Sequence, residues 1–228
     1  KSALSTHSGS GRSERITVMA TGIGTENIDI VMNELDALVN IDLDKKEFKK
    51  EHTALQLFRL GTCGSVNPDV EVDNMLVSEN VVGLDGLLHF YIDYDFENEF
   101  SKNFLEKFPY EKIKPLLYFS EWTASQYEYF KDAKYVGNTA TFPGFYAPQG
   151  RQLRLKSTDD QFLEVLNDLG VTNFEMETSA IYGLSKLLGH KAITINNVIA
   201  NRRRGEFAAD HHQSEKMMIE WVLERVIK

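Results

Sequence analysis

Hydrophobic and polar positions alternate along the chain with two different periods, which predicts strands interleaved with helices. Short apolar runs bounded by glycine or polar residues predict strands at 16–21, 55–60, 75–84, 171–174 and 192–200. Apolar residues spaced three and four positions apart predict amphipathic helices at 25–38, 177–188 and 214–227. Elements in this order indicate a three-layer α/β/α fold around a central mixed sheet.

The ends and faces of the predicted helices carry further signals. Thr25 has the hydroxyl of an N-cap for the first helix, and Gly189 is suited to end the second. We expect the last helix to bury an apolar face made of Met217, Met218, Trp221, Val222 and Val226.

Two stretches show neither the helical nor the strand spacing of hydrophobic residues. The charged segment 42–52 is typical of a solvated connection, whereas 91–133 is aromatic and charged, with helical patches at best. We expect the longer stretch to form an insertion or the surface of a subdomain.

The composition predicts one folded domain over residues 1–228. With 42% hydrophobic and 11% aromatic residues, a chain of this length has enough apolar area for a substantial core. Its 25 basic and 34 acidic residues give a net charge of −9, so no overall basic field attracts a nucleic-acid polymer. Any bound anion must therefore meet locally placed arginines or backbone N–H groups.

Cysteine content and hydropathy bear on the compartment. The single cysteine, Cys63, cannot form an internal disulfide, and no apolar run approaches the roughly 20 residues that cross a bilayer. We therefore expect a cytoplasmic protein with no membrane partner. The chain opens at Lys1 and Ser2 with neither an initiator Met nor the hydrophobic centre of a signal peptide, so we expect that residues are missing upstream.

Segments that follow predicted strands are candidates for chemistry, because ligands of α/β sheets gather at the carboxyl ends of strands. Gly22-Ile23-Gly24-Thr25 offers helix N-terminal N–H groups to an anion, although an ordinary turn has the same sequence. In Arg59-Leu60-Gly61-Thr62-Cys63-Gly64, an arginine inside an apolar strand requires an anion. That anion is either a phosphate or a carboxylate of the protein.

Two further segments combine polar groups suited to a nucleoside. Phe145-Tyr146-Ala147-Pro148-Gln149-Gly150-Arg151 offers an aromatic face, a carboxamide and a guanidinium to a planar base, or else forms a surface turn. Glu175 and Glu177 stand at a strand-to-helix junction, where a carboxylate either complements the helix dipole or holds a vicinal diol.

In this order, the four segments resemble the nucleoside phosphorylase family, and within it the uridine phosphorylases. The resemblance runs from about Ile16 to Arg202 and includes the segment 85–90, Asp-Gly-Leu-Leu-His-Phe. A Gln-x-Arg pair ahead of a Glu-Met-Glu segment makes the combination specific.

The resemblance implies roles for the residues around phosphate and sugar. Arg59, Thr62 and Gly24 would bind phosphate, with Thr62 also close to the ribose. Glu177 would hold the 2′ and 3′ hydroxyls of the ribose, with Met176 contacting the sugar.

For the base, the resemblance implies that Phe145 packs on the ring while Gln149 and Arg151 read uracil and stabilise it as it leaves. Arg202 would lie near O4 and assist them. Purine-specific relatives carry an aspartate near this last position to protonate N7. Here Asn201 stands instead, which favours a pyrimidine.

The implied reaction is an SN1-like displacement of uracil by phosphate at the anomeric carbon, which gives ribose 1-phosphate. It needs a nucleoside and inorganic phosphate and no metal or organic cofactor. No His/Cys cluster in the sequence has the spacing of metal ligands, so His211 and His212 are expected in a polar loop. The family also implies a homodimer or homohexamer with sites completed by a neighbour.

The sequence departs from the family at its start. The Gly-Asp-Pro-x-Arg loop that supplies a glycine and an arginine to phosphate is missing from these residues, and Lys1 and Ser2 are nearest to where an intersubunit arginine is usual. Two alternatives therefore stay open: a catalytically weakened nucleoside-binding or sensing protein, and a nucleosidase of the same fold.

Overall fold

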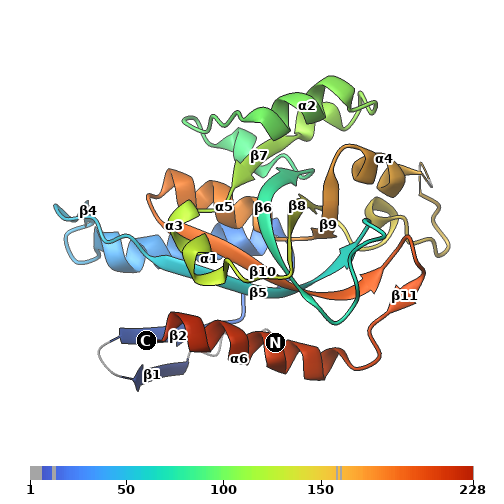
Figure 1. Cartoon of the computed structure of the whole chain (residues 1–228). Helices are drawn as coiled ribbons and strands as arrows, with labels where there is room; N and C mark the ends of the chain where they lie inside the picture. Colours follow the sequence, from blue (N-terminus) through green and yellow to red (C-terminus); the bar gives the residue numbers. More distant parts are fainter. Residues whose placement is uncertain (1–6, 12–13, 158, 160, 228) are drawn as a thin grey trace.

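The computed structural model describes residues 7–11, 14–157, 159 and 161–227. Its centre is a seven-stranded sheet with the order β11-β10-β5-β9-β8-β6-β7 (Figure 1). The strands are β5 Gln56–Ser65, β6 Met75–Gly83, β7 Tyr118–Glu121, β8 Tyr135–Thr141, β9 Val171–Glu175, β10 Lys191–Asn201 and β11 Glu206–Phe207.

The sheet is mixed and closes on itself. Strand β10 runs parallel to β5 and antiparallel to β6, while β8 runs parallel to both β6 and β9. Because β5 pairs antiparallel with β9, the strands β10, β5, β9, β8 and β6 form a closed ring. The central mixed sheet is confirmed; its closure rests on the pairing of β6 with β10, which are distant in the sequence.

Helices flank the sheet, as the predicted fold class requires. Strand β10 passes between α6 on one side of the sheet and α2 and α4 on the opposite side (Figure 1). Helix α5 packs against α1 through a buried cluster that includes Ile28, Met32 and Ile181. The helices are α1 Thr25–Asn40, α2 Glu99–Lys107, α3 Ala124–Tyr127, α4 Phe162–Asp168, α5 Thr178–Leu187 and α6 His211–Val226. Short 3₁₀ turns are η1 Leu87–Phe90, η2 Lys114–Leu116, η3 Glu128–Phe130 and η4 Ala147–Gln149.

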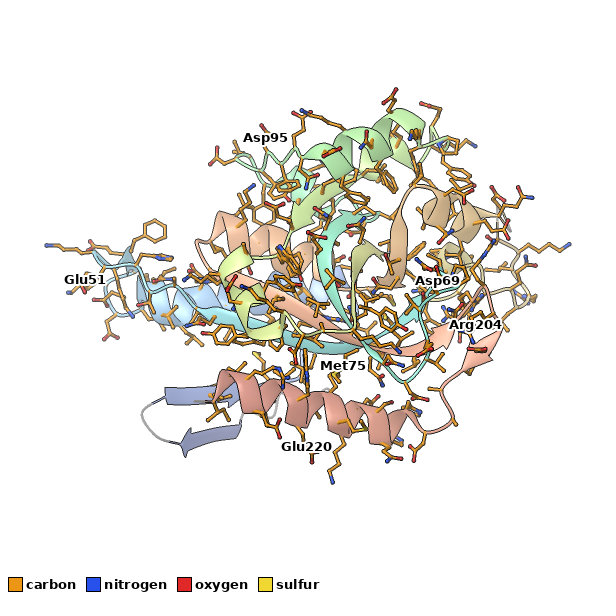
Figure 2. All side chains as sticks on the ribbon, viewed as in Figure 1. Glu51, Asp69, Met75, Asp95, Arg204 and Glu220 are labelled. Carbon is orange, nitrogen blue, oxygen red and sulfur yellow. The ribbon has the colours of Figure 1, made fainter. Side chains whose placement is uncertain are left out.

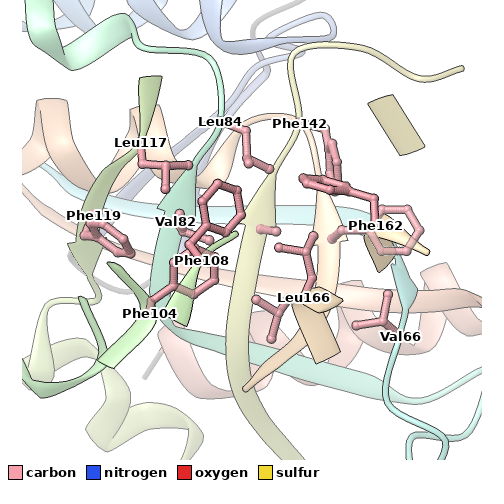
Figure 3. Close-up of a cluster of buried hydrophobic side chains, with 13 residues drawn as sticks. Val66, Val82, Leu84, Phe104, Phe108, Leu117, Phe119, Phe142, Phe162 and Leu166 are labelled. Carbon is pink, nitrogen blue, oxygen red and sulfur yellow. The ribbon is translucent and has the colours of Figure 1, made fainter. Parts of the chain in front are cut away.

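Part of the aromatic segment 91–133 belongs to the core. Its buried residues contradict the expectation of a surface there, while Ile92 near its start is 99% exposed. Phe104 of α2, Phe108 directly after that helix and Phe119 of edge strand β7 are buried in one hydrophobic cluster with Phe142 (Figure 3). The elements in this segment are at most nine residues long, too short for a sequence pattern to show a sustained period.

Strand β5 is longer than the predicted 55–60 and continues through Gly61 and Gly64. A Cβ on Gly61 would lie 2.4 Å from Nη1 of Arg59, and one on Gly64 would lie 2.5 Å from the ring of Phe174. The glycines therefore leave room for neighbouring side chains inside the sheet. They do not terminate the strand.

The predictions for the N-terminal part need correction. Strand β2, Glu14–Val18, stops short of the predicted end and pairs with β1, His7–Gly11, in a separate two-stranded sheet. Gly24, with φ 94°, is the N-cap of α1, and Thr25 is its buried first residue. Glycine adopts this backbone conformation without strain, which explains the shift. Lys1 and Ser2 lie outside the described residues.

The remaining predictions differ in detail. The exposed connection at 42–52 contains a small hairpin of β3, Ile41–Asp42, and β4, Glu47–Phe48. Helix α6 begins earlier than predicted because Asp210 caps it, accepting bonds from the N–H groups of its second and third residues. The pair 211–212 is therefore helical. On the apolar face of α6, Met218 and Val222 are buried but Met217 is 54% exposed.

Charged side chains cover the outside of the molecule, in keeping with its acidic composition. Glu51, Asp95 and Glu220 lie at its outer edge and are exposed (Figure 2). Among the residues that the structure describes, no helix is both long and apolar enough to cross a bilayer.

Candidate functional site

A largely buried arginine on β5 lies at the centre of the site. Nη2 of Arg59 lies 2.5 Å from Oε2 of Glu177 and 3.0 Å from Oε2 of Glu175. Its Nη1 donates a hydrogen bond of 2.8 Å to Oδ1 of Asn196 on β10. The three acceptors come from β9, the start of α5 and β10, so the ring of strands brings together residues that are distant in sequence.

The charges of this cluster perturb one another. Burial alone would lower the pKa of Arg59, but the carboxylates of Glu175 and Glu177 more than offset that effect and raise it. Burial raises the pKa of Glu177, and the neighbouring charge of Glu175 raises it further, against the opposing influence of Arg59. The guanidinium therefore stays charged, while Glu177 takes up a proton more readily than an ordinary glutamate.

Glu175 serves the helix start rather than a ligand. Its carboxylate accepts hydrogen bonds from the backbone N–H groups of Glu177, at 2.9 Å, and Thr178, at 2.9 and 3.1 Å. The hydroxyl of Thr141 donates a further bond of 2.7 Å. The helix-dipole interpretation is therefore right for Glu175, and Glu177 is the carboxylate that remains for a substrate.

Glu177 also contacts the first candidate segment. Its Oε1 accepts a hydrogen bond of 2.7 Å from the backbone N–H of Gly24, at the N-terminus of α1. Each carboxylate oxygen can accept more than one hydrogen bond, so both oxygens of Glu177 keep capacity for a vicinal diol. The segment that begins with Gly22 thus meets the Glu-Met-Glu segment in space.

The candidate base-binding loop is ordered by its own side chains. Gln149 is 3% exposed, and its Oε1 accepts a hydrogen bond from Nη1 of Arg151. The same nitrogen donates 2.8 Å to the carbonyl of Phe145, and the guanidinium stacks 3.8 Å above the Phe145 ring. The carboxamide is thus buried and paired, so the segment is more than a surface turn.

A second arginine lies beside this loop. Burial lowers the pKa of Arg151, and the charge of Arg202 lowers it further. Arg202 is half-buried at the end of β10, where its backbone N–H donates 2.9 Å to the carbonyl of Ser65. Two guanidiniums that repel each other in this way favour a carbonyl or a developing anion between them.

The loop and the glutamate segment leave the sheet at adjacent points. Thr141 at the end of β8 aligns with Glu175 at the end of β9, and the N–H of Phe142 donates 2.8 Å to the carbonyl of Glu175. Met176 is half-buried between the two glutamates, and Thr62 is half-buried on β5. The hydroxyl of Thr62 has no hydrogen-bond partner within the described part of the chain, which leaves it available to a ligand.

Sequence reasoning missed Asn196 and Thr141, which hold the charged residues in place. Both are fully buried. Asn196 lies within the apolar strand predicted at 192–200, and a buried amide needs hydrogen-bond partners. That position was therefore a usable signal of a polar contact inside the fold.

One cluster elsewhere has the residue types of a metal site. Asp36, His52 and His190 place potential ligand atoms within 4.8 Å of one another. Nδ1 of His190 accepts a hydrogen bond of 3.3 Å from the N–H of Leu55, so the proton of the neutral ring sits on Nε2, which faces Asp36 at 3.4 Å. This geometry fits a histidine–aspartate pair rather than a metal ligand set.

Comparison with known proteins assigns the family. A family model described as the phosphorylase superfamily matches residues 2–228. The chain belongs to this superfamily. Within it, the chain is a member of the nucleoside phosphorylase family, which uses nucleosides and phosphate as substrates.

Relatives of similar sequence carry two kinds of name. A uridine phosphorylase of Thermococcus kodakarensis is 26% identical over 227 residues, which cover 95% of this chain and 72% of the relative. A DeoD-type purine nucleoside phosphorylase of Shewanella loihica is 25% identical over 222 residues, covering 96% of this chain and 78% of the relative. The names thus divide between pyrimidine and purine substrates.

A solved structure agrees in fold over nearly the whole chain. The nucleoside phosphorylase of Trypanosoma brucei, described as showing uridine phosphorylase activity, superposes with a TM-score of 0.80 at 26% identity. The match covers 96% of this chain and 82% of the other. This phosphorylase therefore shares the architecture of that enzyme.

Proposed function

We propose that this nucleoside phosphorylase converts uridine and phosphate reversibly into uracil and ribose 1-phosphate. The observation that carries the proposal is the buried carboxamide of Gln149, paired with Arg151 beside Arg202. A carboxamide and a guanidinium complement the alternating carbonyl and N–H groups of uracil.

Phosphate binds to Arg59 and Thr62 beside Gly24, whose own backbone N–H is taken up by Glu177. The guanidinium remains charged at every physiological pH because its pKa is raised. It offers charge-assisted hydrogen bonds to the phosphate oxygens, and the hydroxyl of Thr62 adds a neutral donor.

Ribose lies between the phosphate and the base. Glu177 accepts hydrogen bonds from the 2′ and 3′ hydroxyls, and the thioether of Met176 packs against the sugar. The contact between Arg59 and Glu177 places the phosphate-binding and diol-binding groups side by side, so the nucleophile approaches the sugar at C1′.

The reaction separates charge as the glycosidic bond breaks. The electron pair of the C1′–N1 bond goes to uracil, C1′ gains oxocarbenium character, and a phosphate oxygen forms the new bond to C1′. Gln149 and Arg151, with Arg202, stabilise the uracil anion, which then takes up a proton from water. One well-placed donor of this kind contributes about 3–4 kcal/mol to transition-state stabilisation.

The environment of Asn201 supports uridine over a purine. Its Nδ2 donates to the carbonyls of Asn67 and Val70, at 2.9 and 2.7 Å, and its Oδ1 accepts from the N–H groups of Arg203 and Arg204. The amide is fully used in shaping the turn after β10. It supplies no acid at the position where purine-specific relatives protonate N7.

We further propose that the enzyme is a cytoplasmic homo-oligomer, a dimer or a hexamer. Ile30 of α1 is 62% exposed, and Phe90 and Ile92 near η1 are 86% and 99% exposed. The hydroxyl of Tyr91 hydrogen-bonds to Asp29, so these apolar side chains stand on adjoining elements. Light scattering of the purified protein measures the oligomeric state.

The test of the proposed reaction is to incubate the protein with uridine, with and without inorganic phosphate, and to quantify uracil and ribose 1-phosphate. We expect equal amounts of both products, only when phosphate is present. Cleavage without phosphate would instead identify a nucleosidase, and binding of uridine with no cleavage would identify a sensing protein.

A further inference from the structure

The orientation of Arg59 depends on a neutral partner as well as on its two carboxylates. Asn196 is fully buried, and its Oδ1 accepts a hydrogen bond of 2.8 Å from Nη1 of Arg59. Nη2 faces Glu175 and Glu177. These contacts leave the Nε–H and the second N–H of Nη1 without a partner in the described part of the chain.

The amide of Asn196 is itself locked. Its Nδ2 donates 3.0 Å to Oγ of Ser78 on β6, and that oxygen lies 2.6 Å from Oγ1 of Thr139 on β8. Thr139 continues the chain with a hydrogen bond of 2.8 Å to Oδ1 of Asn173 on β9. A network across four strands therefore fixes which end of the amide faces the arginine.

The backbone opposite Asn196 is shaped to admit this hydrogen bond. In the parallel pairing of β10 with β5, Asn196 aligns with Gly61. Because a Cβ at Gly61 would lie 2.4 Å from Nη1 of Arg59, only glycine leaves the guanidinium room to reach the asparagine. Gly61 and Asn196 thus act on the same end of Arg59.

We propose that Asn196 is a positioning residue for phosphate, an inference that rests on the proposed function of Arg59 in phosphorolysis. It fixes the Nη1 end of the guanidinium so that the two unpartnered N–H groups are presented to phosphate. It does so without charge, because a third carboxylate on one guanidinium would repel the incoming anion.

The experiment measures steady-state kinetics of Asn196→Ala and Asn196→Asp, with Asn197→Ala as the matched control. Asn197 is the adjacent buried amide on β10, and its Nδ2 donates 2.8 Å to Ser214 of α6, so its loss costs a comparable hydrogen bond away from Arg59. Melting temperatures of all three variants report on folding.

For Asn196→Ala we expect the KM for phosphate to rise about tenfold or more, since a hydrogen bond to a charged group is lost, while the KM for the nucleoside changes less than about twofold. Asn196→Asp keeps the acceptor but adds charge, and its KM for phosphate should rise further. Asn197→Ala should keep the wild-type KM for phosphate. A wild-type KM for phosphate in either Asn196 variant would overturn the inference.

Two additions keep the test decisive. If Asn196→Ala does not fold, Ser78→Ala removes the acceptor that holds the amide, and we expect a smaller rise of about two- to fivefold in the KM for phosphate.

If the wild type forms no ribose 1-phosphate from any nucleoside, the proposed function fails, and calorimetric titration with inorganic phosphate tests Asn196 separately. Weaker phosphate binding by Asn196→Ala than by Asn197→Ala supports the inference; equal binding, or none by the wild type, overturns it.

Discussion

The guanidinium of Arg59 and the carboxylate of Glu177 form a largely buried ion pair 2.5 Å long. In the proposed reaction these groups bind different substrates, phosphate and ribose. The phosphate-binding and ribose-binding parts of the site are therefore in direct contact. A substitution in either part is expected to change the affinity for the substrate bound by the other part, and also to change the stability of the fold.

Removal of the arginine should destabilise the protein strongly. Arg59→Ala leaves Glu175 and Glu177 buried without a cation, which is expected to cost about 3–5 kcal/mol in the free energy of unfolding. Urea denaturation measures this loss. The control is Arg203→Ala, which removes a surface ion pair with Glu164 and should cost no more than about 1 kcal/mol. Equal losses would show that the buried pair does not stabilise the fold as described.

The pH dependence should report on Glu177. Because burial and Glu175 raise its pKa, Glu177 takes up a proton at a higher pH than an ordinary glutamate does. A protonated carboxyl is a poorer acceptor for the diol, so kcat/KM for the nucleoside should fall on the acid side, beginning above the usual range of glutamate titration. Glu177→Gln should have a low kcat/KM without this acid limb. If the variant keeps the same limb, another group causes it.

The glycine beside Arg59 offers a test that changes no polar group. Gly61→Ala introduces a methyl group that would lie 2.4 Å from Nη1 and 2.6 Å from Cζ of Arg59, so the guanidinium must move. We expect the KM for phosphate to rise at least tenfold, about 1.4 kcal/mol in binding. Gly205→Ala is the control, because no atom lies within 4 Å of its added Cβ. An alanine at position 205 is strained only by the positive φ of that residue, so this variant should keep the wild-type KM for phosphate.

A substitution in the base-binding loop should lower kcat/KM for the nucleoside and leave the KM for phosphate nearly unchanged. Arg151→Ala removes one donor to the leaving uracil, and kcat/KM for uridine is expected to fall about 100-fold or more. The KM for phosphate should change little, because Arg59 is untouched. Arg154→Ala, an exposed arginine in the same loop, should retain nearly full activity. An unchanged kcat/KM for uridine in Arg151→Ala would remove this arginine from the site.

Local sequence signals predicted the elements that carry the candidate site. The junction of β9 and α5 was recognisable because a short strand, two glutamates and an amphipathic helix follow one another directly. Gln149 is buried and paired with Arg151, which excludes the alternative of a plain surface turn, while its role toward a base stays a prediction. These features depend on neighbours within a few residues, which sequence patterns report.

Features that depend on distant residues were not predictable. The closure of the sheet requires β6 to pair with β10, and the contact of Gly24 with Glu177 joins residues 153 positions apart. The strand predicted at 55–60 stops before Gly61, because a glycine that ends a strand and one that makes room for a side chain look the same in sequence. Only the tertiary packing of Arg59 and Phe174 shows that Gly61 and Gly64 make room for side chains.

The most direct measurement of the central claim compares uridine with inosine as substrates at saturating phosphate. A site that pairs Gln149 and Arg151 with uracil, and that lacks an acid at Asn201, should give a kcat/KM for uridine about 100-fold or more above that for inosine. A kcat/KM for inosine equal to or greater than that for uridine would contradict the assignment of this site to a pyrimidine.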